Sequence, residues 1–139
     1  MNLFVVSPTH IDQAWREGAS KLSQATKRAA DECTGDQLKY RLARGELTLI
    51  TVTSDPPLWL AVNFNQHPNM RVLFIYAMAG ATSGEAMRLV EQYAKQGGAS
   101  AIECAAYGAA ARIGERRYGL SEVYRILRKP LWAAINQIP

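Results

Sequence analysis

RVLFIYAMAGATSGEAMRLV, residues 71–90, is the part of this sequence that carries most information about the fold. Residues 71–78 are apolar on both faces of an extended chain, as expected for a central strand that is covered on both sides. The spacing of apolar residues then becomes helical, and Thr82 and Glu85 form the pattern of a capping box. A glycine pair at positions 97 and 98 should end this helix. The stretch therefore predicts a buried strand, a short loop and a helix.

Strands are predicted on both sides of this unit. The segment AIECAAY, residues 101–107, follows the helix, and a strand–helix–strand connection is right-handed and lays its two strands parallel. Upstream, residues 47–53 and 58–64 are rich in β-branched and apolar side chains and are followed by proline-containing turns. Together with residues 71–78 they predict an antiparallel meander.

The first third of the chain predicts one strand and two helices. Residues 3–6 are short and apolar and stop at a Ser-Pro pair, as expected for a strand. Thr9 can cap a helix with a carboxylate three residues later, and Gly18 should break or bend that helix. Thr34 and the glutamine three residues later form a second capping box, and the helix that follows should end at Gly45.

The last third predicts one more helix and one more strand. An alanine-rich helix is expected over residues 108–117, closed by Gly119, and a strand over Val123–Arg128 ahead of Pro130. The predicted order is β-α-α-β-β-β-α-β-α-β. This is an α/β (α+β) fold with a mixed sheet, expected as a single domain over residues 1–139.

The composition excludes several classes of protein. Its 48% hydrophobic and 20% charged residues are ordinary for a globular domain. No apolar run reaches membrane-spanning length, and the N-terminus lacks the basic start of a signal peptide, so we expect neither membrane insertion nor secretion. Cys33 and Cys104 have no cysteine or histidine at ligand spacing, which predicts two free thiols and no metal site.

The net charge of +4 is unevenly distributed along the chain. Basic and acidic residues cancel over residues 1–108, and the excess of Lys and Arg lies in residues 109–139. A basic C-terminal third favours an anionic partner, which could be a cofactor phosphate, a nucleic acid or an acidic protein surface. The alternative is a solvated charged surface without a partner.

The predicted order of elements resembles the GNAT (GCN5-related N-acetyltransferase) fold over nearly the whole chain. Two local stretches add to the resemblance. Residues 38–49 contain a short helix and then Gly-Glu-Leu-Thr-Leu at the start of the meander. Residues 116–120, Arg-Arg-Tyr-Gly-Leu, are similar to the Leu-Gly-Phe element that ends a helix before the family's last strand. The short length and plain meander look closest to GNAT-like proteins of tailed bacteriophages, some of which are virion-associated.

The resemblance implies a place for acetyl-CoA. In GNAT enzymes the pantetheine bonds to the backbone of the strand before the central helix, where that strand splays from its parallel neighbour. The pyrophosphate lies on the N-terminus of the helix, where unpaired N–H groups and the helix dipole favour an anion. The residues that the resemblance assigns to the cofactor are Tyr76, Ala77, Met78, Gly80, Thr82, Ser83 and Gly84, with Arg112 and Arg116 attracting the CoA phosphates.

The sequence departs from the family pattern in this loop. The pattern's Arg or Gln is absent, and Glu85 places a carboxylate in the first turn of the helix. A negative charge there satisfies the helix end itself and repels a pyrophosphate. The alternative to phosphate binding is an ordinary strand-to-helix turn with a capping box.

Three residues are candidates for proton transfer. Glu103 could act as a general base through water, or be a surface or salt-bridged strand residue. The Asn and Tyr that many GNAT enzymes carry in the following helix are missing here. Tyr107 and Tyr118 are nearby alternatives as proton donors to the leaving thiolate, or else core or interface aromatics.

The three absent family positions favour a non-catalytic role, as a virion-associated or interaction protein of the phage type, in the virion or the host cytoplasm. Its partners would be virion proteins or an anionic partner of the basic C-terminal third, and the fold is compatible with homo-oligomers. The alternative is an acyl-CoA-dependent N-acetyltransferase that uses acetyl-CoA and acts on an unidentified amine. Sequence-specific DNA binding has little support, because no helix-turn-helix or aromatic–basic pattern is present.

Overall fold

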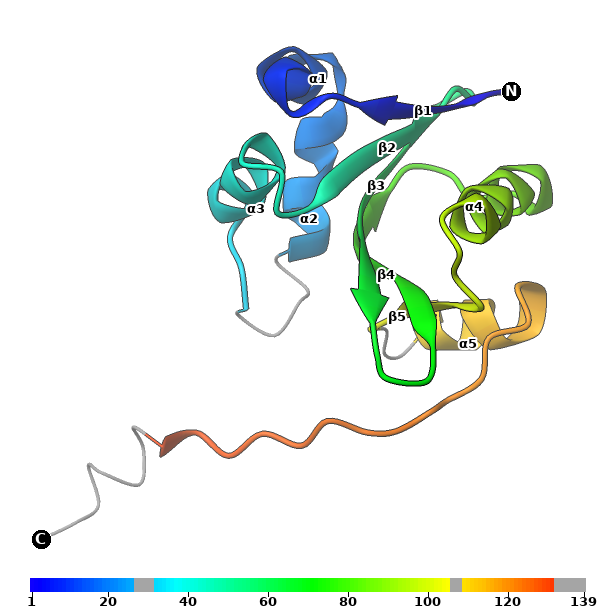
Figure 1. Ribbon diagram of the computed structural model, residues 1–139. Coiled ribbons are helices and arrows are strands. Elements are labelled where there is room, and N and C mark those ends of the chain that lie inside the picture. The colour runs from blue at the N-terminus through cyan, green and yellow to red at the C-terminus, as the bar shows by residue number, and fades with distance from the viewer. Residues whose placement is uncertain (27–31, 106–108, 132–139) are drawn as a thin grey trace, which may run out of the picture. The chain divides into compact units, whose positions relative to one another are not determined.

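Figure 1 shows the computed structural model of the chain, which describes residues 1–26, 32–105 and 109–131. The chain divides into two compact units, Met1–Tyr107 and Gly108–Pro139. The first unit contains the sheet and the helices that pack on it. The expectation of one domain over residues 1–139 stays a prediction.

The first unit is built on one sheet of five strands in the order β1-β2-β3-β4-β5. Strands β1 to β4 pair antiparallel with their neighbours, and β5 pairs parallel with β4. The mixed sheet with an antiparallel meander and one parallel pair is therefore confirmed. The strands are β1 (Leu3–Val6), β2 (Thr48–Val52), β3 (Leu58–Gln66), β4 (Arg71–Ala79) and β5 (Ala101–Cys104).

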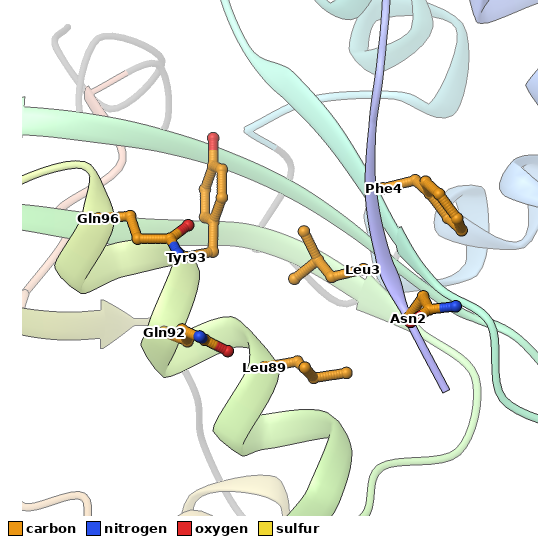
Figure 2. Close-up of a pocket in the computed structure, with 7 residues that line it drawn as sticks. All are labelled: Asn2, Leu3, Phe4, Leu89, Gln92, Tyr93 and Gln96. Carbon is orange, nitrogen blue, oxygen red and sulfur yellow. The ribbon is translucent and has the colours of Figure 1, made fainter.

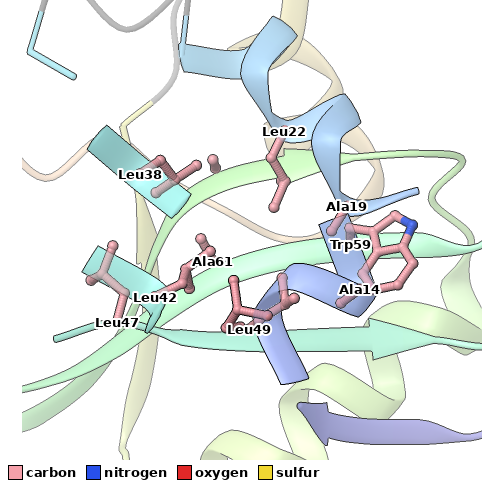
Figure 3. Close-up of a cluster of buried hydrophobic side chains, with 11 residues drawn as sticks. Ala14, Ala19, Leu22, Leu38, Leu42, Leu47, Leu49, Trp59 and Ala61 are labelled. Carbon is pink, nitrogen blue, oxygen red and sulfur yellow. The ribbon is translucent and has the colours of Figure 1, made fainter. Parts of the chain in front are cut away.

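Helices cover both faces of the sheet, as the two-sided apolar pattern of residues 71–78 requires (Figure 1). One face packs against α1 (Ile11–Glu17), α2 (Leu22–Thr26) and α3 (Gly35–Ala43). Figure 3 shows the buried side chains of this layer, which include Trp59 and Ala61 of β3. The other face packs against α4 (Gly84–Gln96).

Alternation along each strand divides the core between the two layers. Leu49 belongs to the layer under α1–α3, whereas its neighbour Ile50 belongs to the layer under α4. Both side chains are fully buried. Burial of one such side chain stabilises the fold by about 1.5–3 kcal/mol, so the sheet is held from both sides.

Local signals set the helix ends in the first third of the chain. Thr34 Oγ1 accepts a hydrogen bond from the Gln37 N–H at 3.2 Å, and Gln37 Oε1 accepts from the Thr34 N–H at 2.8 Å. This is the predicted capping box of α3. Gly45 follows α3 with a φ of +77°, and Gly18 ends α1 with a φ of +152°, so both predicted helix stops are confirmed.

The predicted cap at Thr9 is wrong. A single 3₁₀ turn over Pro8–His10 precedes α1, and the helix begins at Ile11 without any side-chain cap. The Thr9 hydroxyl lies 3.0 Å from the Ser7 hydroxyl. Because the proline-led 3₁₀ turn occupies Thr9, this residue lies inside the turn and does not flank the helix.

The second unit contains α5 (Ala109–Arg117), which ends ahead of Gly119, a residue with a φ of +69°. The strand predicted over Val123–Arg128 does not form: residues 119–130 belong to no helix or strand in the described chain. The large apolar side chains of residues 123–128 are 68–90% exposed. A β-rich pattern yields a strand only where a neighbouring strand supplies hydrogen bonds and a covered face.

No helix within the described ranges is long and apolar enough to cross a bilayer.

Replacement of Thr34 by alanine should lower the free energy of unfolding by about 1 kcal/mol, because it removes the hydroxyl that accepts the hydrogen bond from the Gln37 N–H. Thr9→Ala is the matched control, and it should change stability by less than about 0.5 kcal/mol, because the Thr9 hydroxyl caps nothing. Urea unfolding followed by circular dichroism measures both values. Equal effects of the two substitutions would contradict the assignment.

Candidate functional site

A one-residue bulge interrupts β4 where it pairs with β3. Val62 lies opposite Ile75 and Ala61 lies opposite Ala77, so Tyr76 is the extra residue. The faces agree with this register: Ile75 is buried in the layer under α4, and Ala77 in the layer under α1–α3. In a regular strand these two side chains would share one face.

The parallel pairing of β4 with β5 stops at this bulge. It runs from Val72–Ala101 to Ile75–Cys104. Residues 76–79 continue β4 and pair only with β3 in the part of the chain that the structure describes. Alternate backbone N–H and C=O groups of this segment therefore have no strand partner on the β5 side among the described residues, and we call this side the open edge. Among the described residues the parallel pairing thus ends ahead of Tyr76, Ala77 and Met78, and the assignment of these three residues to the cofactor stays a prediction.

The open edge leads through a short loop into α4. Ser83 caps this helix, and its Oγ accepts a hydrogen bond from the Ala86 N–H at 3.1 Å. The predicted Thr82–Glu85 capping box is therefore wrong by one residue, because the helix starts at Gly84. The Ala86 N–H bonds the Ser83 side chain and the Met87 N–H bonds the Ser83 carbonyl, which leaves the N–H groups of Gly84 and Glu85 to face an anion.

The two glycines of the loop have different roles. Gly80 has a φ of +114°, and a Cβ there would collide with the carbonyl oxygen of Pro57. The close approach of two backbone segments therefore requires glycine at position 80, whether or not a ligand also binds there. Gly84 has nothing within 4 Å of an added Cβ, so it is the glycine that leaves room beside the helix N-terminus.

The polar side chains of the loop give limited help to an anion. The Ser83 hydroxyl already serves as the helix cap. Glu85 lies in the first turn of α4 and is exposed, so its carboxylate opposes part of the favourable field of the helix end. Two backbone N–H groups remain beside the open space at Gly84, and phosphate binding there stays a prediction.

A second group of side chains lies on the α1–α3 side of the bulge. The ring of Tyr76 meets the ring of Phe74 edge-on, with centroids 4.7 Å apart, and the guanidinium of Arg41 from α3 lies over the Tyr76 ring at 5.3 Å. Glu103 is the register partner of Phe74 on β5, and its neighbour Ile102 packs in the layer under α4. Alternation therefore places Glu103 on the same face as Phe74 and Tyr76.

Cys104 lies beside the end of the parallel pairing, as the partner of Ile75. Desolvation raises the pKa of its thiol above the ordinary value, so the sulfur is protonated at neutral pH and is a poor nucleophile. Within the described ranges no three His, Cys, Asp or Glu side chains gather as a metal site would require. Cys33 and Cys104 are both free thiols.

The remaining predicted site residues belong elsewhere. Tyr107 lies outside the described residues. Tyr118, Arg112 and Arg116 belong to the second unit, where the two arginines are exposed on α5 at i, i+4 spacing. The structure thus gathers the predicted residues of β4, its loop and β5 in the first unit.

A cleft of about 350 Å³ lies at the far edge of the sheet, between β1 and α4 (Figure 2). Leu3 and Leu89 point toward this space, and glutamine side chains of α4 flank it. Its one titratable lining group is Tyr93, whose pKa is raised by burial. A lining without charge offers nothing to hold a phosphate or to move a proton at neutral pH. Its lining residues are Asn2, Leu3, Phe4, Leu89, Gln92, Tyr93 and Gln96.

Two features of this candidate site were not predicted from the sequence. The bulge at Tyr76 is hidden because residues 71–78 are apolar on both faces, so no break in alternation marks it. Arg41 lies one turn from Leu38 on α3, at the border of its buried stripe, and nothing in its local sequence indicates the contact with Tyr76. Both features depend on residues distant in the chain.

The fold of this chain is similar to that of several solved acetyltransferase structures. A probable acetyltransferase shares 14% identity with this chain, with a TM-score of 0.65 over 94% of this chain and 98% of that one. An aminoglycoside acetyltransferase, HMB0005, from an uncultured soil metagenomic sample has 18% identity and a TM-score of 0.59 over 94% and 99%. Another from such a sample, meta-AAC0020, solved with sisomicin, has 9% identity and a TM-score of 0.60 over 93% and 95%.

These likenesses establish that the chain has the GNAT-type acetyltransferase fold. No protein-family model matches the sequence, and no curated protein matches it either.

The two loop glycines should respond oppositely to alanine. Gly80→Ala should lower the free energy of unfolding by at least about 2 kcal/mol, because it combines a left-handed backbone with a collision at Pro57. Gly84→Ala should be neutral or stabilising by up to about 1 kcal/mol, because it adds a methyl group to a helix in open space. Chemical denaturation compares the two, and a tolerated Gly80→Ala would contradict the assigned role.

Proposed function

We propose that this chain is an acyl-CoA-dependent N-acyltransferase that acts on an amine. One observation supports the proposal: the β4–β5 pairing stops at the bulge, and within the described ranges residues 76–79 have no partner on that side, directly before the N-terminus of α4. An extended chain of amides fits an open strand edge, and a pyrophosphate fits a helix N-terminus. The GNAT-type fold uses these two elements together for acyl-CoA.

The open edge would hold the pantetheine through the backbone of Tyr76, Ala77 and Met78. The N–H groups of Gly84 and Glu85 would then face the pyrophosphate. A bound acyl-CoA supplies an activated thioester at the bulge. The side chains of Tyr76 and Met78 are each 39% exposed, so space beside this edge is open to solvent and to an acceptor.

Glu103 is the residue of this unit best placed to take a proton. It lies on the same face as Phe74 and Tyr76, one strand away from the bulge. An acceptor amine must lose a proton as its nitrogen forms the new bond to the acyl carbon and the carbon–sulfur bond breaks. Glu103 would accept this proton through water, and the released thiolate would take a proton from solvent. The remaining acceleration of acyl transfer would come from holding the thioester and the amine close together at the strand edge.

Isothermal titration with acetyl-CoA tests the binding step. We expect saturable binding below about 1 mM, a free energy more favourable than about −4 kcal/mol. Gly84→Asp should weaken this binding at least about tenfold, because it adds a carboxylate where the pyrophosphate would lie. The same carboxylate favours the helix N-terminus, so the fold should remain stable.

Gly84→Ala is the matched control, since it fills the same open space without charge and should bind acetyl-CoA nearly as the parent does. Absence of any binding at about 1 mM would refute the proposed function. Equal affinities of the Asp and Ala variants would refute the placement of the pyrophosphate.

Glu103→Gln should lower the rate of amine acetylation by about 10²- to 10⁴-fold, because the amide cannot accept the proton. Its affinity for acetyl-CoA should stay unchanged, because the backbone of β4 and α4 would hold the cofactor. Glu91→Gln, an exposed change on α4, is the control. Thiol release from acetyl-CoA in the presence of an amine panel gives the rates, and an unimpaired Glu103→Gln would remove Glu103 from the mechanism.

A second candidate function is a non-catalytic interaction role, like that of virion-associated GNAT-like proteins of tailed bacteriophages. The segment of residues 119–131 supports it, because Val123, Tyr124, Ile126, Leu127 and Leu131 are 68–90% exposed beside basic residues. Exposed apolar side chains at this density are typical of a surface that binds a partner. Copurification with phage particles, lost on deletion of residues 119–139, would support this role, and recovery only as free protein would oppose it.

A further inference from the structure

A pair of arginines and two aromatic rings form a surface beside the bulge. Arg41 stacks on the ring of Tyr76 at 5.3 Å, and Arg44 stacks on the ring of Tyr40 at 5.3 Å. Stacking on an aromatic face fixes the position of a guanidinium and leaves its N–H groups available at the rim of the plane. The Arg41 side chain is 37% exposed, so a ligand can reach it.

One carboxylate serves both arginines. Glu46 Oε2 lies 3.4 Å from Arg41 Nε, and Glu46 Oε1 lies 3.4 Å from Arg44 Nε. These contacts are long for charge-assisted hydrogen bonds, and all three side chains are at least one third exposed. Such pairs contribute little net free energy, so a second carboxylate can compete for Arg41. Because two guanidiniums share one carboxylate, these three side chains together carry an excess positive charge.

The face also carries a charge of opposite sign. Glu103 is the register partner of Phe74, whose ring meets the ring of Tyr76 under Arg41. A guanidinium and a carboxylate thus lie on one face of the sheet, on the two sides of an aromatic pair. This distribution of charge is complementary to a small molecule with an ammonium at one end and a carboxylate at the other.

We propose that the acceptor is an amine that also bears a carboxylate, an amino acid or the like, and that Arg41 binds this carboxylate while the amine faces Glu103. The inference rests on the proposed acyltransfer function and names its substrate class. The fork of an arginine suits a carboxylate in two parallel hydrogen bonds, which also orients the amine toward the bulge. A polycationic amine would place like charge against Arg41 and Arg44.

The test compares L-phenylalanine with L-phenylalaninamide, which differ in the carboxylate and share the amine and the aromatic ring. At saturating acetyl-CoA, the preference for the acid over the amide should fall about tenfold in Arg41→Gln. Arg16→Gln, which removes the same charge from the exposed side of α1, should leave the preference unchanged. Glu46→Gln removes the competing carboxylate and should increase the preference for the acid.

Three results would overturn the inference. An unchanged preference in Arg41→Gln, with acetyl-CoA still bound, would exclude Arg41 as the carboxylate site. A loss of affinity for succinyl-CoA but not acetyl-CoA would assign Arg41 to a carboxylate on the acyl group instead. Equal loss for acid and amide would indicate a merely structural role, which thermal unfolding of the variant checks independently.

Failure of the proposed function gives a different signature. If acetyl-CoA does not bind, titration of the free protein with N-acetyl-L-phenylalanine and its amide, followed by NMR, still tests the carboxylate site. Stronger binding of the acid, lost in Arg41→Gln, would then support recognition of the carboxylate without acyl transfer. Equal binding of the two probes would refute the inference.

Discussion

The extra residue in β4 is the constraint on which most of this molecule depends. Because Tyr76 has no partner of its own on β3, the side chains on either side of it change faces, and Ile75 and Ala77 enter different core layers. The parallel pairing with β5 stops one residue before Tyr76, and residues 76–79 have no partner on that side within the described ranges. Its ring then lies on the face where Arg41 and Phe74 contact it. A single local irregularity thus positions the strand edge, the core and a charged surface at once.

In the short loop between β4 and α4, some residues are determined by packing and others by the electrostatics of the helix end. Gly80 is needed because the backbone of Pro57 leaves no room for a side chain. Ser83 satisfies one orphan N–H of the helix, and two others remain. Glu85 weakens the field of those two groups without occupying them. The helix end is thus capped by its own side chain, and two of its N–H groups have no helix or cap partner.

The charged groups divide between two parts of the chain with different roles. In the first unit, Arg41 and Glu103 lie on one face of the sheet around an aromatic pair. In the second unit, exposed arginines and apolar side chains occur together in and after α5. Chemistry at the strand edge would use residues of the first unit, and association through residues 119–131 would use residues of the second. Substitutions can therefore test the two proposed functions separately.

The sequence by itself determined the elements that depend on neighbours within a few positions. The capping box at Thr34 and the stops at Gly18 and Gly45 are local hydrogen-bond and backbone effects, and the two-sided apolar pattern of residues 71–78 already required a covered central strand. Only the tertiary structure decided the bulge at Tyr76, the contact of Arg41 with its ring and the absence of a strand over Val123–Arg128. Each of these depends on contacts with a segment that is distant in the chain. The periodicity of one segment does not specify which distant residues it will contact.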